Sequence, residues 1–165
     1  MTVTTVTKNL EQATMTIVAE YSASPARVWQ LWADPRQLER WWGPPTHPAT
    51  VTEHDLAPEG IVRYYMTGPD GERYHGGWRM ISVEEPSRLE FEDFFADDEG
   101  GENPDLPRTR TVVSIDEQGS GETRMTIASF FPSPEAMAQV LEMGMEEGIT
   151  QALSQTDAIL AEHHS

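Results

Sequence analysis

The C-terminal stretch, residues 133–162, constrains the fold most because it reads as one amphipathic helix. Ser133 is a residue type that caps helix N-termini, and Pro134 suits the first helical position. The residues of the expected buried face recur with helical rather than strand spacing. They are Met137, Leu141, Met145, Ile149, Ala152, Thr156, Ile159 and Leu160. Such a helix would be roughly 40 Å long at 1.5 Å per residue, which is enough to cross a small domain.

Two glycines, Gly144 and Gly148, lie four residues apart inside this stretch and therefore share one helical face. Each should cost about 1 kcal/mol relative to alanine. One interpretation is that a strand or turn crosses the helix closely at these positions. The other is that the missing side chains leave a hollow, walled by Met143, Met145 and Ile149, in which a ligand can lie. The two interpretations are compatible.

The preceding chain alternates between strand-like runs and turn residues. Residues 13–21 predict a strand, and residues 25–34 and 35–42 predict two short helices, each opened by a capping residue and proline. Further strands are expected at 50–56, 61–67, 72–85, 88–95, 110–116 and 122–131. The long strand has an expected bulge at Gly76-Gly77. Residues 1–12 are polar and unpatterned, which predicts a disordered or frayed start.

This order of elements predicts an α+β fold in one domain spanning residues 13–162. Six to seven antiparallel strands form a single sheet whose apolar face needs a cover. The long helix is the element large enough to cover it, and the two short helices would close one end. The acidic segment 97–105 is expected to be a flexible loop, because its spacing does not match a calcium-binding loop.

Composition excludes several classes of function. The chain carries 28 acidic against 11 basic residues, a net charge of −17, which disfavours nucleic acids and anionic membranes as partners. It has no cysteine, so thiolate chemistry is excluded, and the histidines show no metal-ligand spacing. No stretch approaches the roughly 20 apolar residues of a membrane span, and no signal pattern is present. We therefore expect a cytoplasmic protein without membrane insertion, bound metal or cofactor.

Several motifs resemble the START-like (SRPBCC) helix-grip superfamily, within the branch related to the activator of the ninety-kilodalton heat-shock protein ATPase. The motif PARVWQLWADPRQLERWW, residues 25–42, is similar to the opening signature of that branch. Further similarities are GIVRYYMTGPDG at 60–71, His75-Gly76-Gly77, PSRL at 86–89 and Glu147-Gly148-Ile149. The resemblance implies a Bet v 1-type helix-grip fold over nearly the whole chain. It says little about function, because this superfamily hosts carriers, receptors and enzymes.

Two departures from the family pattern bear on function. Ile149 stands where many relatives carry tryptophan, which would make a pocket roomier. Residues 1–12 are too few to supply the additional N-terminal domain of the eukaryotic activator. This counts against a chaperone partner, which the resemblance suggests but the residues do not support. A homodimer is compatible with the sequence.

The candidate pocket combines aromatic and apolar side chains with a few polar groups, as small-molecule sites do. We expect it to be lined by Trp42, Tyr64, Met66, His75, Trp78, Phe91, Asp93, Phe131, Met145, Gly148 and Ile149. His75 could serve as donor or base, although a solvent-facing histidine is the simpler reading. Strand alternation places Phe91 inward between Glu90 and Glu92, and it also points Asp93 inward, neutral or paired with Arg63 or Arg110. Of the adjacent Trp41 and Trp42, one should be core and the other at the mouth.

Three functions follow from these observations. The first is binding of a small apolar or aromatic ligand without a cofactor. The second is a cyclase, dehydratase or hydrolase type of enzyme in the same pocket, with His75 or Asp93 as base and a tyrosine as acid. The third is an interaction protein that activates a chaperone ATPase. No catalytic residue is assigned from the sequence.

Overall fold

The computed structural model describes residues 2–97, 101–103, 105–106, 108–119 and 121–162. Its strands are β1 (Thr2–Asn9), β2 (Thr14–Tyr21), β3 (Ala49–His54), β4 (Ile61–Thr67), β5 (Arg73–Glu84), β6 (Arg88–Phe95), β7 (Thr109–Gly119) and β8 (Glu122–Phe130). Its helices are α1 (Pro25–Ala33), α2 (Pro35–Trp41), α3 (Pro134–Glu142), α4 (Met145–Leu153) and α5 (Thr156–Glu162).

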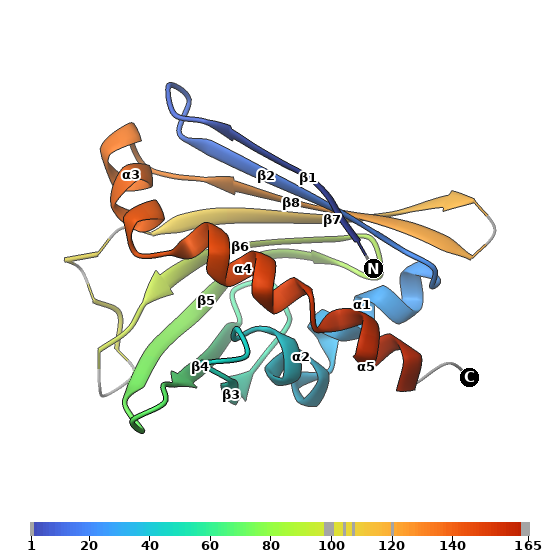
Figure 1. Ribbon diagram of the computed structural model, residues 1–165, viewed down its shortest axis with the longest axis horizontal. Helices are drawn as coiled ribbons and strands as arrows, with labels where there is room; N and C mark the ends of the chain where they lie inside the picture. Colours follow the sequence, from blue (N-terminus) through green and yellow to red (C-terminus); the bar gives the residue numbers. More distant parts are fainter. Residues whose placement is uncertain (1, 98–100, 104, 107, 120, 163–165) are drawn as a thin grey trace.

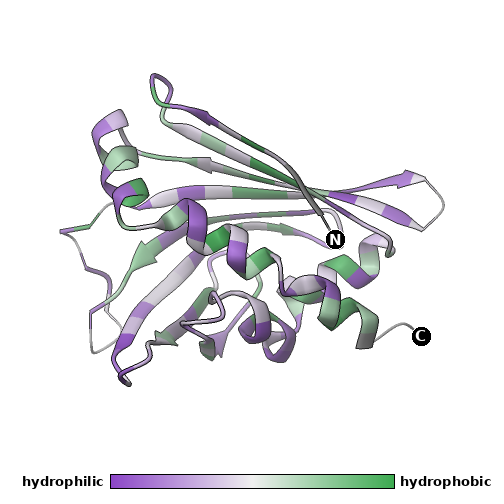
Figure 2. Cartoon of the chain, in the orientation of Figure 1, coloured by the Kyte–Doolittle hydropathy of each residue, from purple (hydrophilic) through white to green (hydrophobic). Residues whose placement is uncertain are grey.

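Within this described part of the chain, the strands form one antiparallel sheet in the order β1-β2-β8-β7-β6-β5-β4-β3. The C-terminal helices run across one face of the sheet, with α1 and α2 beside α5 at one end (Figure 1). Hydrophobic and hydrophilic residues alternate along α4 and α5, as the one-sided burial of these helices requires (Figure 2). The expected α+β, helix-grip arrangement is confirmed, with eight strands instead of six or seven.

The additional strand is β1, so the prediction of a frayed start over residues 1–12 was wrong. β1 pairs antiparallel with β2 and extends the sheet at that edge. Val6 packs against the core, and the Lys8 ammonium lies 2.6 Å from the Glu146 carboxylate on α4. Threonine and valine favour strands, but the scarcity of large apolar residues in β1 hides this tendency in the sequence.

The two short helices begin as their capping residues predict. The Ser24 side chain accepts a hydrogen bond from the Arg27 N–H at 3.3 Å, and Asp34 accepts one from the Arg36 N–H at 2.9 Å. Pro25 and Pro35 occupy the first turns, where a missing N–H costs nothing. These caps fix where α1 and α2 begin.

The expected long helix is divided into α3, α4 and α5. Gly144 has φ +88°, a left-handed conformation that ends α3 and precedes α4, and a second break separates Leu153 from Thr156. The expectation of close crossing by a strand is also wrong, because a Cβ at Gly144 or Gly148 would meet nothing within 4 Å. No helix in the described residues is long and apolar enough to span a membrane.

Aromatic rings fill the centre of the core between the sheet and the helices. The Trp32 ring centroid lies 4.9 Å from that of Trp41 and 5.7 Å from that of Trp78. Trp78 stacks on Phe91 at 4.3 Å, and both residues are fully buried. This cluster joins α1 and α2 to strands β5 and β6, so the short helices are packed into the core rather than placed at its rim.

Gly76 and Gly77 do not form the expected bulge. The pairing of β4 with β5 runs through them without a shift, with Tyr64 opposite Gly76 and Arg63 opposite Gly77. A Cβ on Gly76 would lie 2.7 Å from the Tyr64 hydroxyl oxygen, and one on Gly77 would lie 2.5 Å from the Phe94 ring. The two glycines therefore make room for aromatic rings on opposite faces of the sheet.

Candidate functional site

Four buried or partly buried side chains form a polar cluster on the inner face of the sheet: Trp42, Tyr64, Trp78 and Asp93, referred to below as the Tyr64 cluster. Tyr64 comes from β4, Trp78 from β5, Asp93 from β6, and Trp42 from the residue that caps α2. The Trp42 ring lies 4.8 Å from that of Trp78 and 5.9 Å from that of Tyr64, both edge to face. Antiparallel pairing sets Asp93 beside Trp78, which brings the carboxyl into the same group.

The Tyr64 hydroxyl donates a long hydrogen bond of 3.4 Å to the Asp93 carboxylate. Burial of the carboxyl group raises the pKa of Asp93 from 3.8 to about 7, although the hydrogen bond from Tyr64 opposes the shift. Burial, and then the nearby Asp93 charge, raises the pKa of Tyr64 well above 10. Asp93 therefore titrates near neutral pH, while Tyr64 keeps its proton.

The indole N–H groups of Trp42 and Trp78 are buried and have no hydrogen-bond partner. Both interact with the Tyr64 oxygen sufficiently to lower the pKa of that hydroxyl, but neither reaches hydrogen-bonding geometry. A buried donor without a partner costs about 1–3 kcal/mol. Two such donors beside a tyrosine and a carboxyl group are therefore unusual and require a reason.

The adjacent tryptophans differ in burial, which agrees with the core position expected for one of them, while the position of the other at a pocket mouth stays a prediction. Trp41 is fully buried, and its indole N–H donates to the Leu31 carbonyl at 2.8 Å, so it is a satisfied core residue. Trp42 is only partly buried and packs against the edge of the core. Gln155, between α4 and α5, donates to the Gly43 carbonyl at 2.7 Å and holds the segment after Trp42 under the helices.

His75 lies on the opposite face of the sheet from the Tyr64 cluster. Its neighbours in β5, Gly76 and Trp78, alternate with it, and its cross-strand partner is Tyr65 rather than Tyr64. The His75 and Tyr65 ring centroids are 5.6 Å apart, and the Arg73 guanidinium covers Tyr65 at 4.4 Å. The placement of His75 in the pocket was therefore wrong, because the strand runs without the bulge that would have reset its alternation.

The other expected lining residues lie on both sides of the space between sheet and α4. Met66 follows Tyr64 on the inner face of β4, while Met145 and Ile149 project from α4. All three are partly buried and pack against the core. Phe91 is fully buried beneath Trp78, and Phe131 is buried just beyond the end of β8. Phe91 and Phe131 are therefore core residues, and the partly buried residues are nearer the surface.

Neither of the two arginines considered as partners of Asp93 reaches it, so the paired alternative is wrong and the neutral alternative remains. Arg63 lies 3.6 Å from Glu53, and Arg110 lies 2.7 Å from Glu90, in each case on the outer face. Glu90 and Glu92 flank the buried Phe91 on the outer, wetter face, as alternation predicts. The hydrogen bond from Arg110, and to a smaller extent the one from Arg88, holds the pKa of Glu90 below its usual value.

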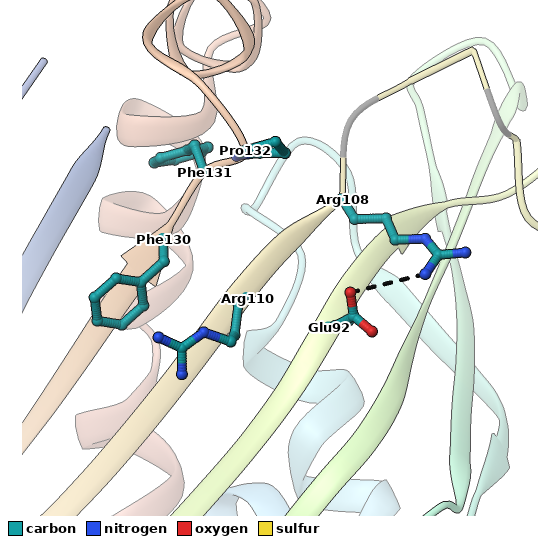
Figure 3. Close-up of a pocket in the computed structure, with 6 residues that line it drawn as sticks. All are labelled: Glu92, Arg108, Arg110, Phe130, Phe131 and Pro132. Atoms are coloured by element: carbon teal, nitrogen blue, oxygen red, sulfur yellow. Dashed lines mark ion pairs between the residues drawn. The ribbon is translucent and has the colours of Figure 1, made fainter. Parts of the chain in front are cut away.

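A concavity with a volume of about 430 Å³ lies on the outer face, at the ends of β6, β7 and β8 and away from the Tyr64 cluster (Figure 3). It is lined by Glu92, Arg108, Arg110, Phe130, Phe131 and Pro132. Its cations are already paired, Arg108 with Glu92 and Glu102 and Arg110 with Glu90, and Arg110 also covers the Phe130 ring. This pocket is open and internally neutralised, so it lacks an unpaired group to select a ligand.

No group of three or more metal-ligating side chains occurs among the described residues. The acidic segment 97–105 lies partly outside the described residues. Of its described part, Glu102 forms an isolated bridge with Ala96 and pairs with arginines from neighbouring strands.

Sequence reasoning identified the members of the Tyr64 cluster but not their mutual arrangement. The sequence signal that could have revealed it was Gly76, opposite Tyr64 in the β4–β5 hairpin. A glycine in a strand often marks close approach by another group, and here that group is the Tyr64 hydroxyl.

Residues 22–161 match the family described as "Activator of Hsp90 ATPase homolog 1-like protein". Protein Ms6760 from Mycobacterium smegmatis is 50% identical, with a TM-score of 0.89 over 96% of this chain and 97% of its own. A protein from Arthrobacter aurescens is 48% identical, with a TM-score of 0.93 over 98% of this chain and 93% of its own.

More distantly, an AHSA1 protein from Silicibacter pomeroyi shares the fold at 22% identity, with a TM-score of 0.72 over 92% of this chain and 100% of its own. No curated protein matches the sequence. The signature of the short helices, the sheet and the family match agree, and this chain belongs to the family of activator of Hsp90 ATPase homolog 1-like proteins.

Proposed function

We propose that this protein binds a small apolar or aromatic ligand between the inner face of the sheet and α4, without a cofactor. The main support for this proposal is the inward-facing stripe of α4, in which Met145, Gly148, Ile149 and Ala152 recur at helical spacing. Ala152 is fully buried, and Met145 and Ile149 are partly buried against the core. Gly148 lies on this same stripe, yet a Cβ added there would meet nothing within 4 Å.

Gly148 is partly exposed and the space around its Cβ position is open, whereas side chains in a protein interior are close-packed. A glycine there also costs about 1 kcal/mol of helix stability relative to alanine. An apolar ligand beneath α4 would fill that space and contact Met145, Ile149 and Met66. Ile149 would leave more room beneath α4 than the tryptophan that the family resemblance led us to expect there.

Ligand-shift melting against a metabolite library tests the proposal, with 2-ethylnaphthalene as a defined apolar probe. A ligand at a hundredfold excess over its dissociation constant should add about 2.7 kcal/mol to the free energy of unfolding. Gly148→Trp should abolish the shift by occupying the space, while Gly148→Ala, which adds only a Cβ, should retain it. A full shift in a folded Gly148→Trp protein would refute binding under α4.

A catalytic role in the same place is a second candidate, favoured by the hydrogen bond between Tyr64 and Asp93. Asp93 has a pKa raised to about 7, which suits a general base near neutral pH, and Tyr64 would be the hydrogen-bond donor or acid. Turnover of a compound found in the library screen should then disappear in Asp93→Asn while binding persists. Unchanged turnover in that variant would exclude Asp93 as the base.

The family description also suggests activation of a chaperone ATPase, and this rests on the match over residues 22–161 alone. The direct test adds the purified chain to Hsp90 and measures ATP hydrolysis. A rate that stays constant up to saturating concentrations would exclude this activity.

A further inference from the structure

The Tyr64 cluster contains more hydrogen-bond donors than it uses. The Nε1–H groups of Trp42 and Trp78 are buried and interact with the Tyr64 oxygen without reaching hydrogen-bonding geometry, and the two rings meet edge to face at 4.8 Å. The Tyr64 proton is directed to Asp93 across 3.4 Å, a distance long enough to leave that hydrogen bond weak. An incoming oxygen atom could therefore accept hydrogen bonds from both indoles.

Backbone positions hold these donors in place. Trp78 is stacked on Phe91 in the middle of the sheet, and Trp42 follows α2, whose start is fixed by the Asp34 cap. Gly76 leaves the space that the Tyr64 hydroxyl occupies. Because donors on rigid elements lose little freedom when a ligand arrives, this arrangement is preorganised for an acceptor.

The charge around the cluster selects the kind of acceptor. Asp93 is the ionisable group that faces it from β6, and Tyr64 faces it from β4. The nearby arginines of these strands and of β7 point to the outer face, where Arg63 pairs with Glu53, Arg110 with Glu90 and Arg108 with Glu102. A carboxylate ligand would thus meet a carboxyl group without a compensating cation, which disfavours anions.

We infer that the site recognises its ligand through an uncharged oxygen acceptor, such as a ketone, aldehyde or amide carbonyl, held by the indole N–H groups of Trp42 and Trp78, and that it rejects carboxylates. This inference rests on the proposed function, since it assigns the polar end of the ligand whose apolar body lies under α4. It adds a chemical class of ligand and two specificity-determining residues.

Three probes that share the naphthalene ring system but differ in their polar group separate apolar binding from recognition of a carbonyl or a carboxylate. They are 2-ethylnaphthalene, 2-acetylnaphthalene and 2-naphthoate, titrated into the full chain by calorimetry at pH 8. We expect the ketone to bind about tenfold more tightly than the hydrocarbon, because a good hydrogen bond contributes about that much. The carboxylate should bind most weakly. Its affinity should rise at least about tenfold in Asp93→Asn, which removes the like charge but keeps the shape.

Trp42→Phe and Trp78→Phe test the donors directly. Each should reduce the preference for the ketone over the hydrocarbon while leaving hydrocarbon affinity within about twofold, because the smaller phenyl ring keeps an apolar aromatic surface but has no N–H group. Trp42→Phe keeps the test decisive if Trp78→Phe fails to fold, since Trp42 is only partly buried. His75→Gln, on the outer face of the same strand, is the matched control and should change neither affinity.

The outcomes distinguish the inference from the proposed function. Equal affinity for hydrocarbon and ketone, or a ketone preference that survives both tryptophan variants, would overturn the inference and leave apolar binding intact. Tightest binding of the carboxylate in the unmodified protein would overturn it as well. Absence of binding by all three probes would instead count against the proposed function itself.

Discussion

The pH dependence of folding offers a sharp test of the buried carboxyl group. Asp93 has a pKa of about 7 in the folded chain, against an ordinary value of 3.8, because burial disfavours its charged form. Folding therefore favours the protonated group. The associated stability is fully present at acidic pH, falls as the pH rises from about 4 to about 7, and is absent above that range.

The size of the effect follows from these two pKa values. Between pH 5 and pH 8.5, linkage predicts that Asp93 alone removes about 3 kcal/mol from the free energy of unfolding. Asp93→Asn keeps a group of the same shape that can accept the Tyr64 hydrogen bond but cannot ionise. The stability of Asp93→Asn relative to the unmodified protein should therefore grow by about 3 kcal/mol between these two pH values.

Urea denaturation followed by tryptophan fluorescence measures this difference, because Trp42 and Trp78 lie beside Asp93. The comparison between variants removes the contribution of the many acidic residues that both proteins share. Glu92→Gln, on the outer face of the same strand, controls for the loss of one negative charge from a chain of net charge −17. A stability difference that stays constant across this pH range would refute the account of Asp93 as a buried group whose pKa is raised to about 7.

Three further predictions concern the helices and the Tyr64 cluster. Trp41→Phe should lower the free energy of unfolding by about 2–4 kcal/mol, because it leaves the buried Leu31 carbonyl without its donor. Trp42→Phe should lower it by about 1 kcal/mol or less, because the indole N–H that is lost has no hydrogen-bond partner, and urea denaturation of both variants measures the difference. Gly144→Ala should cost about 1–2 kcal/mol at its positive φ, while Gly148→Ala should stabilise α4 by up to about 1 kcal/mol, and opposite shifts in melting temperature would confirm this. Gly76→Ala should displace the Tyr64 ring and weaken the binding free energy of 2-acetylnaphthalene by more than it lowers the free energy of unfolding. Unchanged affinity would show that Tyr64 had not moved.

The fold followed from local patterns that need no knowledge of distant contacts. Ser24-Pro25 and Asp34-Pro35 each define a helix start, because a side-chain cap and a fixed φ act within one turn. Alternation along β6 placed Phe91 inward between Glu90 and Glu92, since successive side chains of a strand must face opposite ways. The family signature joined these pieces into the helix-grip arrangement.

The local sequence pattern could not predict the structure where two backbone conformations have similar local free energies. The sequence of α3 to α5 has continuous helical spacing, and its glycines permit either an unbroken helix or a left-handed break. The observed break at Gly144 redirects α4, whose Glu146 meets Lys8 on the distant strand β1. The N-terminal segment likewise forms a strand because it pairs with the edge of β2, and its threonine and valine residues without large apolar side chains were too weak a signal to predict that pairing.

The sequence by itself determined the residue types of the candidate site: an inward Asp93 on β6, a tyrosine on β4 and tryptophans at the end of α2 and in β5. Only the tertiary structure decided which of them meet. Continuous pairing through Gly76 turned His75 outward and brought Tyr64 to Asp93, while the end of α2 set Trp42 against Trp78. The physical reason is that side-chain direction is fixed locally, whereas the neighbour across a strand depends on register, and register is settled by the packing of the whole sheet.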